Sequence, residues 1–346
     1  MIRFGKSVQT AGNQLCCRPP RFLVAAIVSI LIAIQPCSTQ PSAPVLRLLA
    51  PLSNSSLPLL LLAERDPIPG IDIQTTLYQN HAQALALLLR GEAELLLAGT
   101  TQGWENYLSG GPLLMISTGV WGISYLIGSR DCPPIRSIPD LAGRAIALPF
   151  PGSPLDFQTR FLLQHHGLDP DQDLKLIYSP PPQAAALLLK GQIDAAPIPE
   201  PLASELVVHR GLQRFLDYKQ EWASARDGDP RSPQVSLFAT RSYAEQNDSM
   251  LKELVVQWRA ATEQVVKDPS GAAAEFHGIL GFSEEVITLS IPGTLFYVPP
   301  PEENRDRVRT YYEAIKGFLP GKRGSPAKTG ELEDAFFFPL DGSEEN

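Results

Sequence analysis

Short apolar runs recur along the chain, separated by longer segments rich in Leu and Ala. VLRLLA at 45–50 has the length and composition of a buried parallel strand, because a strand covered by helices on both faces needs no polar positions. Further strands are predicted at IDIQTTLY (71–78), AELLLAG (93–99), RAIALPF (144–150), LKLIYS (174–179) and IDAAPI (193–198).

One phrase occurs twice, as QALALLLRG at 83–91 and QAAALLLKG at 183–191. Ala and Leu are good helix formers, and a Gly just past the last Leu is typical of a helix C-terminus. Each copy leads directly into one of the predicted strands. We interpret the two phrases as the same helix in two equivalent units of the fold.

Two further helices are expected at 53–65 and 153–167, where Ser, Asn or Ser-Pro opens the segment. Each unit then runs strand, helix, strand, helix, strand. Such units form parallel sheets with helices on their faces. The sequence therefore predicts an α/β protein of two lobes, each with a mostly parallel sheet flanked by helices.

Two segments connect the predicted lobes and would form a two-stranded hinge. They are the apolar and then Pro-rich stretch at 119–143 and the return at 233–243. The later helices, expected to pack on lobe 1, cover 250–267, 270–280, a stretch from 283, and 301–318. The predicted parts are a leader and tether at 1–43, lobe 1 at 44–125 plus 236–320, lobe 2 at 126–235, and a tail at 321–346.

The N-terminus is typical of an exported protein. Basic residues precede FLVAAIVSILIAI at 22–34, which is short for a membrane span and suits a secretory signal. An uncleaved membrane anchor is the alternative. Cys37 lies where a bacterial lipoprotein carries its lipid, although Pro36 replaces the usual small residue, so cleavage and release without a lipid is also open. We expect a periplasmic or other extracytoplasmic location.

Composition excludes several function classes. A net charge of −8 shows no basic surface for nucleic acid. Cys132 is the one cysteine outside the leader, so no disulfide framework is expected. Neighbouring His165 and His166 do not have the spacing of a metal-binding pair on a helix. We expect no metal, no cofactor and no catalytic residues.

Candidate ligand contacts follow the predicted strands, because open α/β sheets bind ligands at the carboxyl ends of their strands. Helix starts there offer free N–H groups to an anion or other acceptor. Simpler roles stay open: Ser53 or Ser153 could be a helix cap, Trp121 a core or hinge residue, and Glu200 a solvated loop charge. The candidates are Ser53, Asn54, Ser55, Thr100, Thr101, Trp121, Ser153, Pro154 and Glu200.

The stretch 140–206 resembles the second lobe of nitrate/sulfonate/taurine-type solute-binding proteins of ABC importers, which are related to binders of thiamine pyrimidine precursors. DLAGRAIALP, HGLDPDQDLKLI and LLLKGQIDAAPIPEP carry this resemblance through their order and spacing. ALLLRGEAELLLAG and GPLLMISTGVWGISYLIGS extend it to the first lobe more loosely. The resemblance implies a type II periplasmic-binding-protein fold, and it assigns ligand contacts to the candidates above except Glu200.

The resemblance also implies a function: a monomer that closes on a small organic solute and delivers it to a membrane permease driven by an ATPase. APLSNSSLP after the first strand has no basic residue, which favours a sulfonate, pyrimidine-like solute or other small organic acid over nitrate or bicarbonate. The alternatives are an enzyme on the same fold, of the menaquinone-pathway or pyrimidine-synthase kind, and a sensor lobe for a signalling partner.

Overall fold

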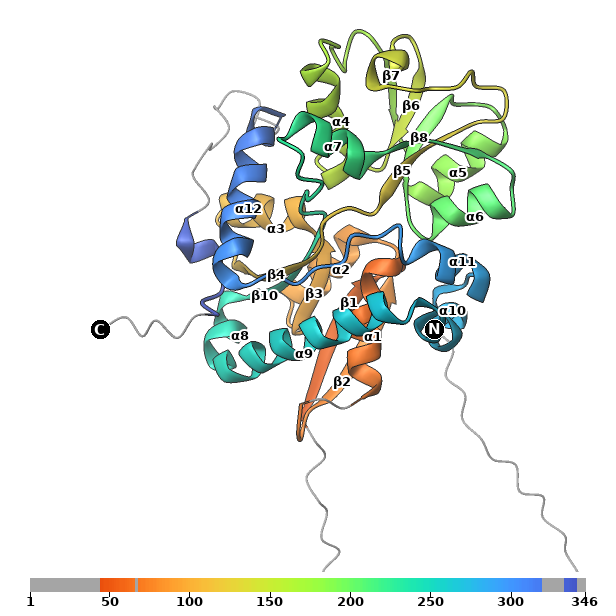
Figure 1. The fold of residues 1–346 in the computed structure, drawn as a ribbon. Coiled ribbons are helices and arrows are strands. Elements are labelled where there is room, and N and C mark those ends of the chain that lie inside the picture. Colours follow the sequence, from red (N-terminus) through yellow and green to blue (C-terminus); the bar gives the residue numbers. More distant parts are fainter. Residues whose placement is uncertain (1–43, 66–67, 319–332, 341–346) are drawn as a thin grey trace, which may run out of the picture. The chain divides into compact units, whose positions relative to one another are not determined.

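The computed structural model describes residues 44–65, 68–318 and 333–340 (Figure 1). The chain divides into Met1–Ser42 and a compact unit, Ala43–Asn346, which contains everything described below. The predicted signal segment, Cys37 and most of the predicted tail lie outside the described residues.

The strands form two sheets of equivalent topology. Their bounds are β1 Val45–Pro51, β2 Asp72–Tyr78, β3 Leu95–Gly99, β4 Leu113–Val120, β5 Ser124–Gly128, β6 Ala145–Leu148, β7 Lys175–Tyr178, β8 Ala195–Pro199, β9 Gln213–Asp217 and β10 Val235–Thr240. The first sheet has the order β2-β1-β3-β10-β4 and the second β7-β6-β8-β5-β9. All six predicted strands are therefore found, and the two-lobed α/β class is confirmed.

Helices flank both sheets, and Figure 1 shows α1 and α9 side by side. The helix bounds are α1 Leu57–Glu64, α2 His81–Leu89, α3 Thr100–Leu108, α4 Pro154–His165, α5 Pro181–Leu189, α6 Leu202–Val208, α7 Tyr218–Ala225, α8 Arg241–Gln246, α9 Asp248–Lys267, α10 Pro269–Leu280, α11 Glu284–Ser290 and α12 Pro301–Ile315. Short 3₁₀ turns cover Asn54–Ser56, Ile138–Leu141, Lys316–Phe318 and Asp334–Phe336. Within the described ranges, the helices lack the combined length and apolarity that crossing a bilayer requires.

The repeated phrase forms α2 in one unit and α5 in the other. Both helices begin two residues before the phrase and end at its last Leu. Gly91 and Gly191 follow with φ of 72° and 64°, a left-handed conformation that L side chains rarely adopt. Their N–H groups donate to the Leu88 and Leu188 carbonyls, which closes each helix. The predicted equivalence of the two phrases is confirmed.

The strands after the two crossings run against their neighbours. β5 is antiparallel to β8 and β9, and β10 is antiparallel to β3 and β4, whereas the other strands of each sheet share one direction. The crossings themselves are residues 121–123 and 226–234. A chain that enters a sheet from its carboxyl edge must run away from that edge, which explains the reversal. The exact lobe boundaries remain a prediction.

Two helical glycines test how closely the first sheet packs on its helices. An added Cβ on Gly103, in α3, would lie 2.0 Å from the Phe238 ring, whereas one on Gly278, in α10, would meet nothing within 4 Å. Helix propensity alone favours Ala at both positions by about 1 kcal/mol. We predict that Gly103→Ala lowers the free energy of unfolding by about 1–3 kcal/mol because the core is overpacked. Gly278→Ala should raise it, and denaturant unfolding of both variants measures the contrast; stabilisation by Gly103→Ala would contradict the packing.

Candidate ligand-binding site

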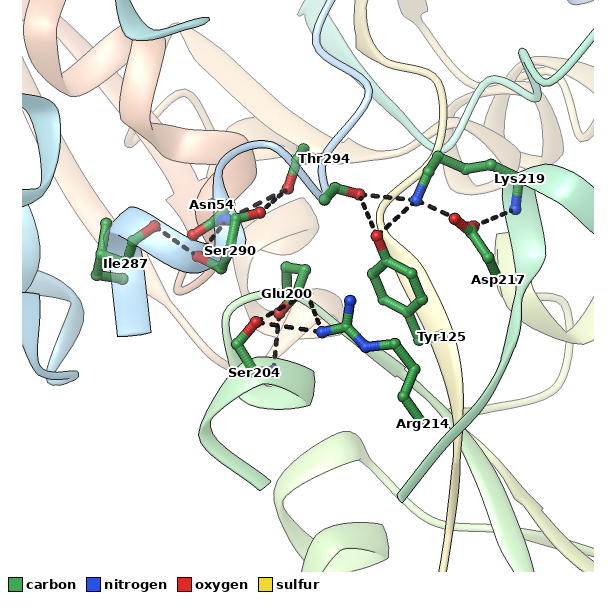
Figure 2. Close-up of polar contacts among 11 residues, drawn as sticks. Asn54, Tyr125, Glu200, Ser204, Arg214, Asp217, Lys219, Ile287, Ser290 and Thr294 are labelled. Atoms are coloured by element: carbon green, nitrogen blue, oxygen red, sulfur yellow. Dashed lines mark hydrogen bonds and ion pairs between the residues drawn. The ribbon is translucent and has the colours of Figure 1, made fainter. Parts of the chain in front are cut away.

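Polar side chains from both sheets meet around one turn, Ser290–Thr294, which follows α11 (Figure 2). Asn54 follows the carboxyl end of β1 in the first sheet, and Glu200 follows that of β8 in the second. Tyr125 is the second residue of the antiparallel β5 and therefore lies at the same edge as Glu200. The rule that ligand contacts gather at carboxyl edges thus identifies a real polar cluster.

Asn54 is fully buried and leaves one acceptor unused. Its Nδ2 donates to Ser290 Oγ at 2.8 Å and to Thr294 Oγ1 at 3.2 Å. Both hydroxyls are themselves donors, to the carbonyls of Ile287 and Ser290, so they need a donor from Asn54 and fix its amide orientation. Asn54 Oδ1 then has no hydrogen-bond partner among the described residues. A buried acceptor without a partner is costly, so this oxygen suits a donor from a ligand.

Glu200 is also fully buried, which excludes its interpretation as a solvated loop charge. Its carboxylate accepts hydrogen bonds from Ser204 N at 2.9 Å, Ser204 Oγ at 3.0 Å and Arg214 Nη2 at 2.8 Å. Burial raises the pKa of Glu200, while Arg214 and Ser204 act to lower it. Because protein groups already satisfy this carboxylate, it has little capacity left for an amine.

Tyr125 contacts two cations. The Arg214 guanidinium is 3.6 Å from the centroid of the Tyr125 ring and Lys219 Nζ is 4.2 Å from it. Lys219 Nζ also donates to Tyr125 Oη at 2.9 Å and to the Gly293 carbonyl at 2.8 Å. Cation–π contacts of this kind are stronger where water is excluded, so the tyrosine fixes both cations at the site.

The turn packs closely against residues of the second sheet at Gly293. An added Cβ on Gly293 would lie 2.9 Å from Tyr125 Oη and 3.1 Å from Glu200 Oε1. A side chain at position 293 would therefore press on Tyr125 and Glu200, and glycine avoids this contact.

A second group of predicted residues joins α3 to the start of α4. Thr101 Oγ1 donates to the Gly152 carbonyl at 2.7 Å, and an added Cβ on Gly99 would lie 3.1 Å from the Pro154 ring. Ser153 Oγ accepts from Asp156 N at 3.1 Å, so it caps α4. These contacts connect the end of β3 with the residues after β6.

The remaining candidates form hydrogen bonds to protein groups away from the Ser290–Thr294 turn. Ser53 Oγ and Ser55 Oγ are 2.6 Å apart, and Thr100 Oγ1 is 2.7 Å from Ser236 Oγ. Trp121 is fully buried and its Nε1 donates to the Tyr297 carbonyl at 2.8 Å, which favours the core or hinge role. Ligand contact by these residues remains a prediction.

Sequence reasoning missed Arg214, Lys219 and the Ser290–Thr294 turn. The local signal for the first two is weak, because QRFLD at 213–217 runs polar, polar, apolar, apolar, polar and lacks the alternation of a half-buried strand. A strand predicted there would end two residues before Lys219. Nothing local in the sequence marks the turn, because tertiary packing brings it to the site.

Two surface cavities lie elsewhere. One of about 320 Å³ is lined by α9 and residues 296–300, and one of about 490 Å³ by residues 227–231 and Leu295. Neither is lined by a predicted ligand contact. Most of the predicted contacts are instead buried within the protein.

Comparisons with known proteins agree with this architecture. Residues 135–280 match the model of the NMT1-like family. A search of curated proteins finds no match.

Several solved structures share the fold at low sequence identity. The alkanesulfonate-binding protein SsuA from Xanthomonas axonopodis pv. citri, bound to MOPS, is 21% identical, with a TM-score of 0.64 over 81% of this chain and 95% of that one. The aliphatic sulphonate-binding SsuA of Escherichia coli is 18% identical, with a TM-score of 0.65 over 84% and 99%. The nitrate-binding NrtA of Synechocystis PCC 6803 is 14% identical, with a TM-score of 0.65 over 81% and 83%.

The resemblance expected from the sequence is confirmed. The chain has the two-lobed α/β fold of periplasmic sulfonate- and nitrate-binding proteins, and its residues 135–280 carry the sequence pattern of the NMT1-like family.

Proposed function

We propose that this protein is the extracytoplasmic solute-binding component of an ABC importer. It binds a small organic solute between its two lobes and delivers it to a membrane permease driven by an ATPase. The observation that carries the proposal is the buried polar cluster in which Asn54, from one sheet, and Glu200 and Tyr125, from the other, meet at one turn. A protein that closes two lobes on a solute, here called a clamp, needs buried polar groups from both lobes to recognise it.

The role of a binding protein fits the site better than that of an enzyme. The carboxylates near the turn, Glu200 and Asp217, are held in ion pairs with cations of the protein. The Ser204 hydroxyl, which donates to Glu200 Oε1, is itself buried. The names of the neighbours describe binding proteins, which supports transport. A sensor lobe would bind its solute in the same way, but its partner would be a signalling protein and not a permease. Export, with a lipid on Cys37 or without one, follows from the leader and is part of the proposal.

The first prediction concerns solute binding. A panel of sulfonates, pyrimidines, amino acids and aromatic acids should contain a solute that raises Tm, with the stability gain growing as RT ln(1 + [L]/Kd). Turnover of that solute by the purified protein would contradict the proposal, as would a panel without any stabilising member. Copurification with a permease and its ATPase separates transport from sensing.

The second prediction uses Gly293. The Cβ of Gly293→Ala would press on Tyr125 Oη and Glu200 Oε1 and disfavour the closed contact of the turn. We expect the affinity for the solute to fall about tenfold or more, by the usual cost of overpacking. Gly278→Ala, in open space, is the matched control and should bind normally. Titration calorimetry compares the two, and equal affinities would show that the turn does not take part in closure.

The contact between α3 and α4 also makes stability depend on pH. Glu105 Oε1 would lie 2.7 Å from a Cβ added to Gly152, so the Glu105 carboxyl abuts the start of α4. Burial, together with the negative charge of Asp156, raises the pKa of Glu105 to about 7. Between its ordinary value of 4.5 and about 7, the folded protein keeps a proton that the unfolded chain has released.

The third prediction follows from that difference. The contribution of Glu105 to the free energy of unfolding is fully present below pH 4.5 and is lost as the pH rises to about 7. Glu105→Gln removes this titration, so its Tm should fall less over the same interval than that of the wild type. Thermal melts from pH 4 to 8 measure both proteins. Parallel Tm profiles would refute the assignment.

A further inference from the structure

The charges at the candidate site are paired within the protein. Arg214 Nη2 lies 2.8 Å from Glu200 Oε1, and Lys219 Nζ lies 3.0 Å from Asp217 Oδ1. Two cations and two carboxylates leave no formal net charge at the turn. Such a site lacks the uncompensated positive charge that would attract an anion.

Lys219 is held by protein groups as well. Its Nζ donates to Tyr125 Oη and to the Gly293 carbonyl, and it forms an ion pair with Asp217 Oδ1. An anionic oxygen would have to compete with these groups.

Two other residues at the site have unused hydrogen-bonding capacity. Asn54 Oδ1 is a buried acceptor without a donor, as shown above. Arg214 uses only Nη2, so its Nε and Nη1 have no hydrogen-bond partner among the described residues, and its side chain is 34% exposed. Figure 2 shows the two residues on either side of Glu200. The site therefore offers one acceptor from the first lobe and donors from the second.

A neutral amide-like group matches this pair of demands, because its N–H serves Asn54 Oδ1 and its oxygen serves Arg214. A sulfonate or carboxylate has only acceptors at neutral pH. Its oxygens would leave Asn54 Oδ1 without a partner and would face Glu200 and Asp217. A site that hydrogen-bonds a substrate N–H rejects the analogue that lacks it.

We infer that this clamp selects an uncharged solute carrying an amide-like donor and acceptor over an anion of the same size. The inference rests on the proposed function, because it assumes that solute binds at the Ser290–Thr294 turn. It distinguishes the solute of this chain from the sulfonate and nitrate named for its structural neighbours.

The experiment compares isosteric pairs on the full chain by titration calorimetry: benzamide with benzoate, benzenesulfonamide with benzenesulfonate, and acetamide with acetate. We expect the neutral member of the pairs that bind to be tighter by about tenfold or more. Its affinity should also change little between low and high salt, since the site has no net charge.

Glu200→Gln provides a gain-of-function test in the same assay. The substitution keeps the size of the side chain and removes one carboxylate charge, so that Arg214 becomes available to an anion. We expect affinity for the anionic members to rise about tenfold and to become salt-dependent. Glu205→Gln removes a carboxylate from α6, where Glu205 pairs with His209, and is the matched control. It should leave the preference as in the wild type.

The outcomes separate this inference from the proposed function. Equal binding within a pair, or tighter and salt-dependent binding of the anion by the wild-type protein, overturns the inference and leaves a solute-binding clamp in place. An unchanged anion affinity in Glu200→Gln also counts against it. If no member of the three pairs binds and the wider panel has no stabilising solute, both the inference and the proposed function fail.

Discussion

The rest of the site depends on the turn at Ser290–Thr294, which accepts hydrogen bonds from both halves of the structure. The Gly293 carbonyl accepts hydrogen bonds from Tyr125 Oη at 3.2 Å and from Lys219 Nζ at 2.8 Å, the first in β5 of the second sheet and the second in α7, which follows β9 of that sheet. The neighbouring Ser290 and Thr294 hydroxyls accept from Asn54, which follows the first sheet. Because these groups are largely buried, each must find a partner within the protein or in a ligand. That requirement couples the two lobes.

The fold was largely predictable because its strongest signals are local. The apolar runs marked the central strands, and the repeated phrase marked α2 and α5 with their terminal glycines. The antiparallel direction of β5 and β10 was not read from the pattern, since an apolar strand has the same composition in either direction. Their direction follows from the crossings, which is a property of the whole topology.

The candidate site was predictable only in part. Asn54 and Glu200 follow predicted strands, so the rule about carboxyl ends found them. The same rule selected Ser153, which caps α4, and Trp121, which packs in the core. Arg214 was missed because its strand, β9, is an edge strand with a weak pattern, and Lys219 because it lies in α7, just after that strand. The Ser290–Thr294 turn lies more than two hundred residues from Asn54 in the sequence, and only packing unites them.

The central claim is that the lobes close on a solute, and small-angle X-ray scattering tests it most directly. The hydrogen bonds from Thr101 to Gly152 and from Tyr125 to Gly293 join groups of the two sheets, and a bound solute should favour the form that contains them. The account predicts a smaller radius of gyration at saturating solute than without it. A radius of gyration that stays the same or increases upon binding would contradict the account.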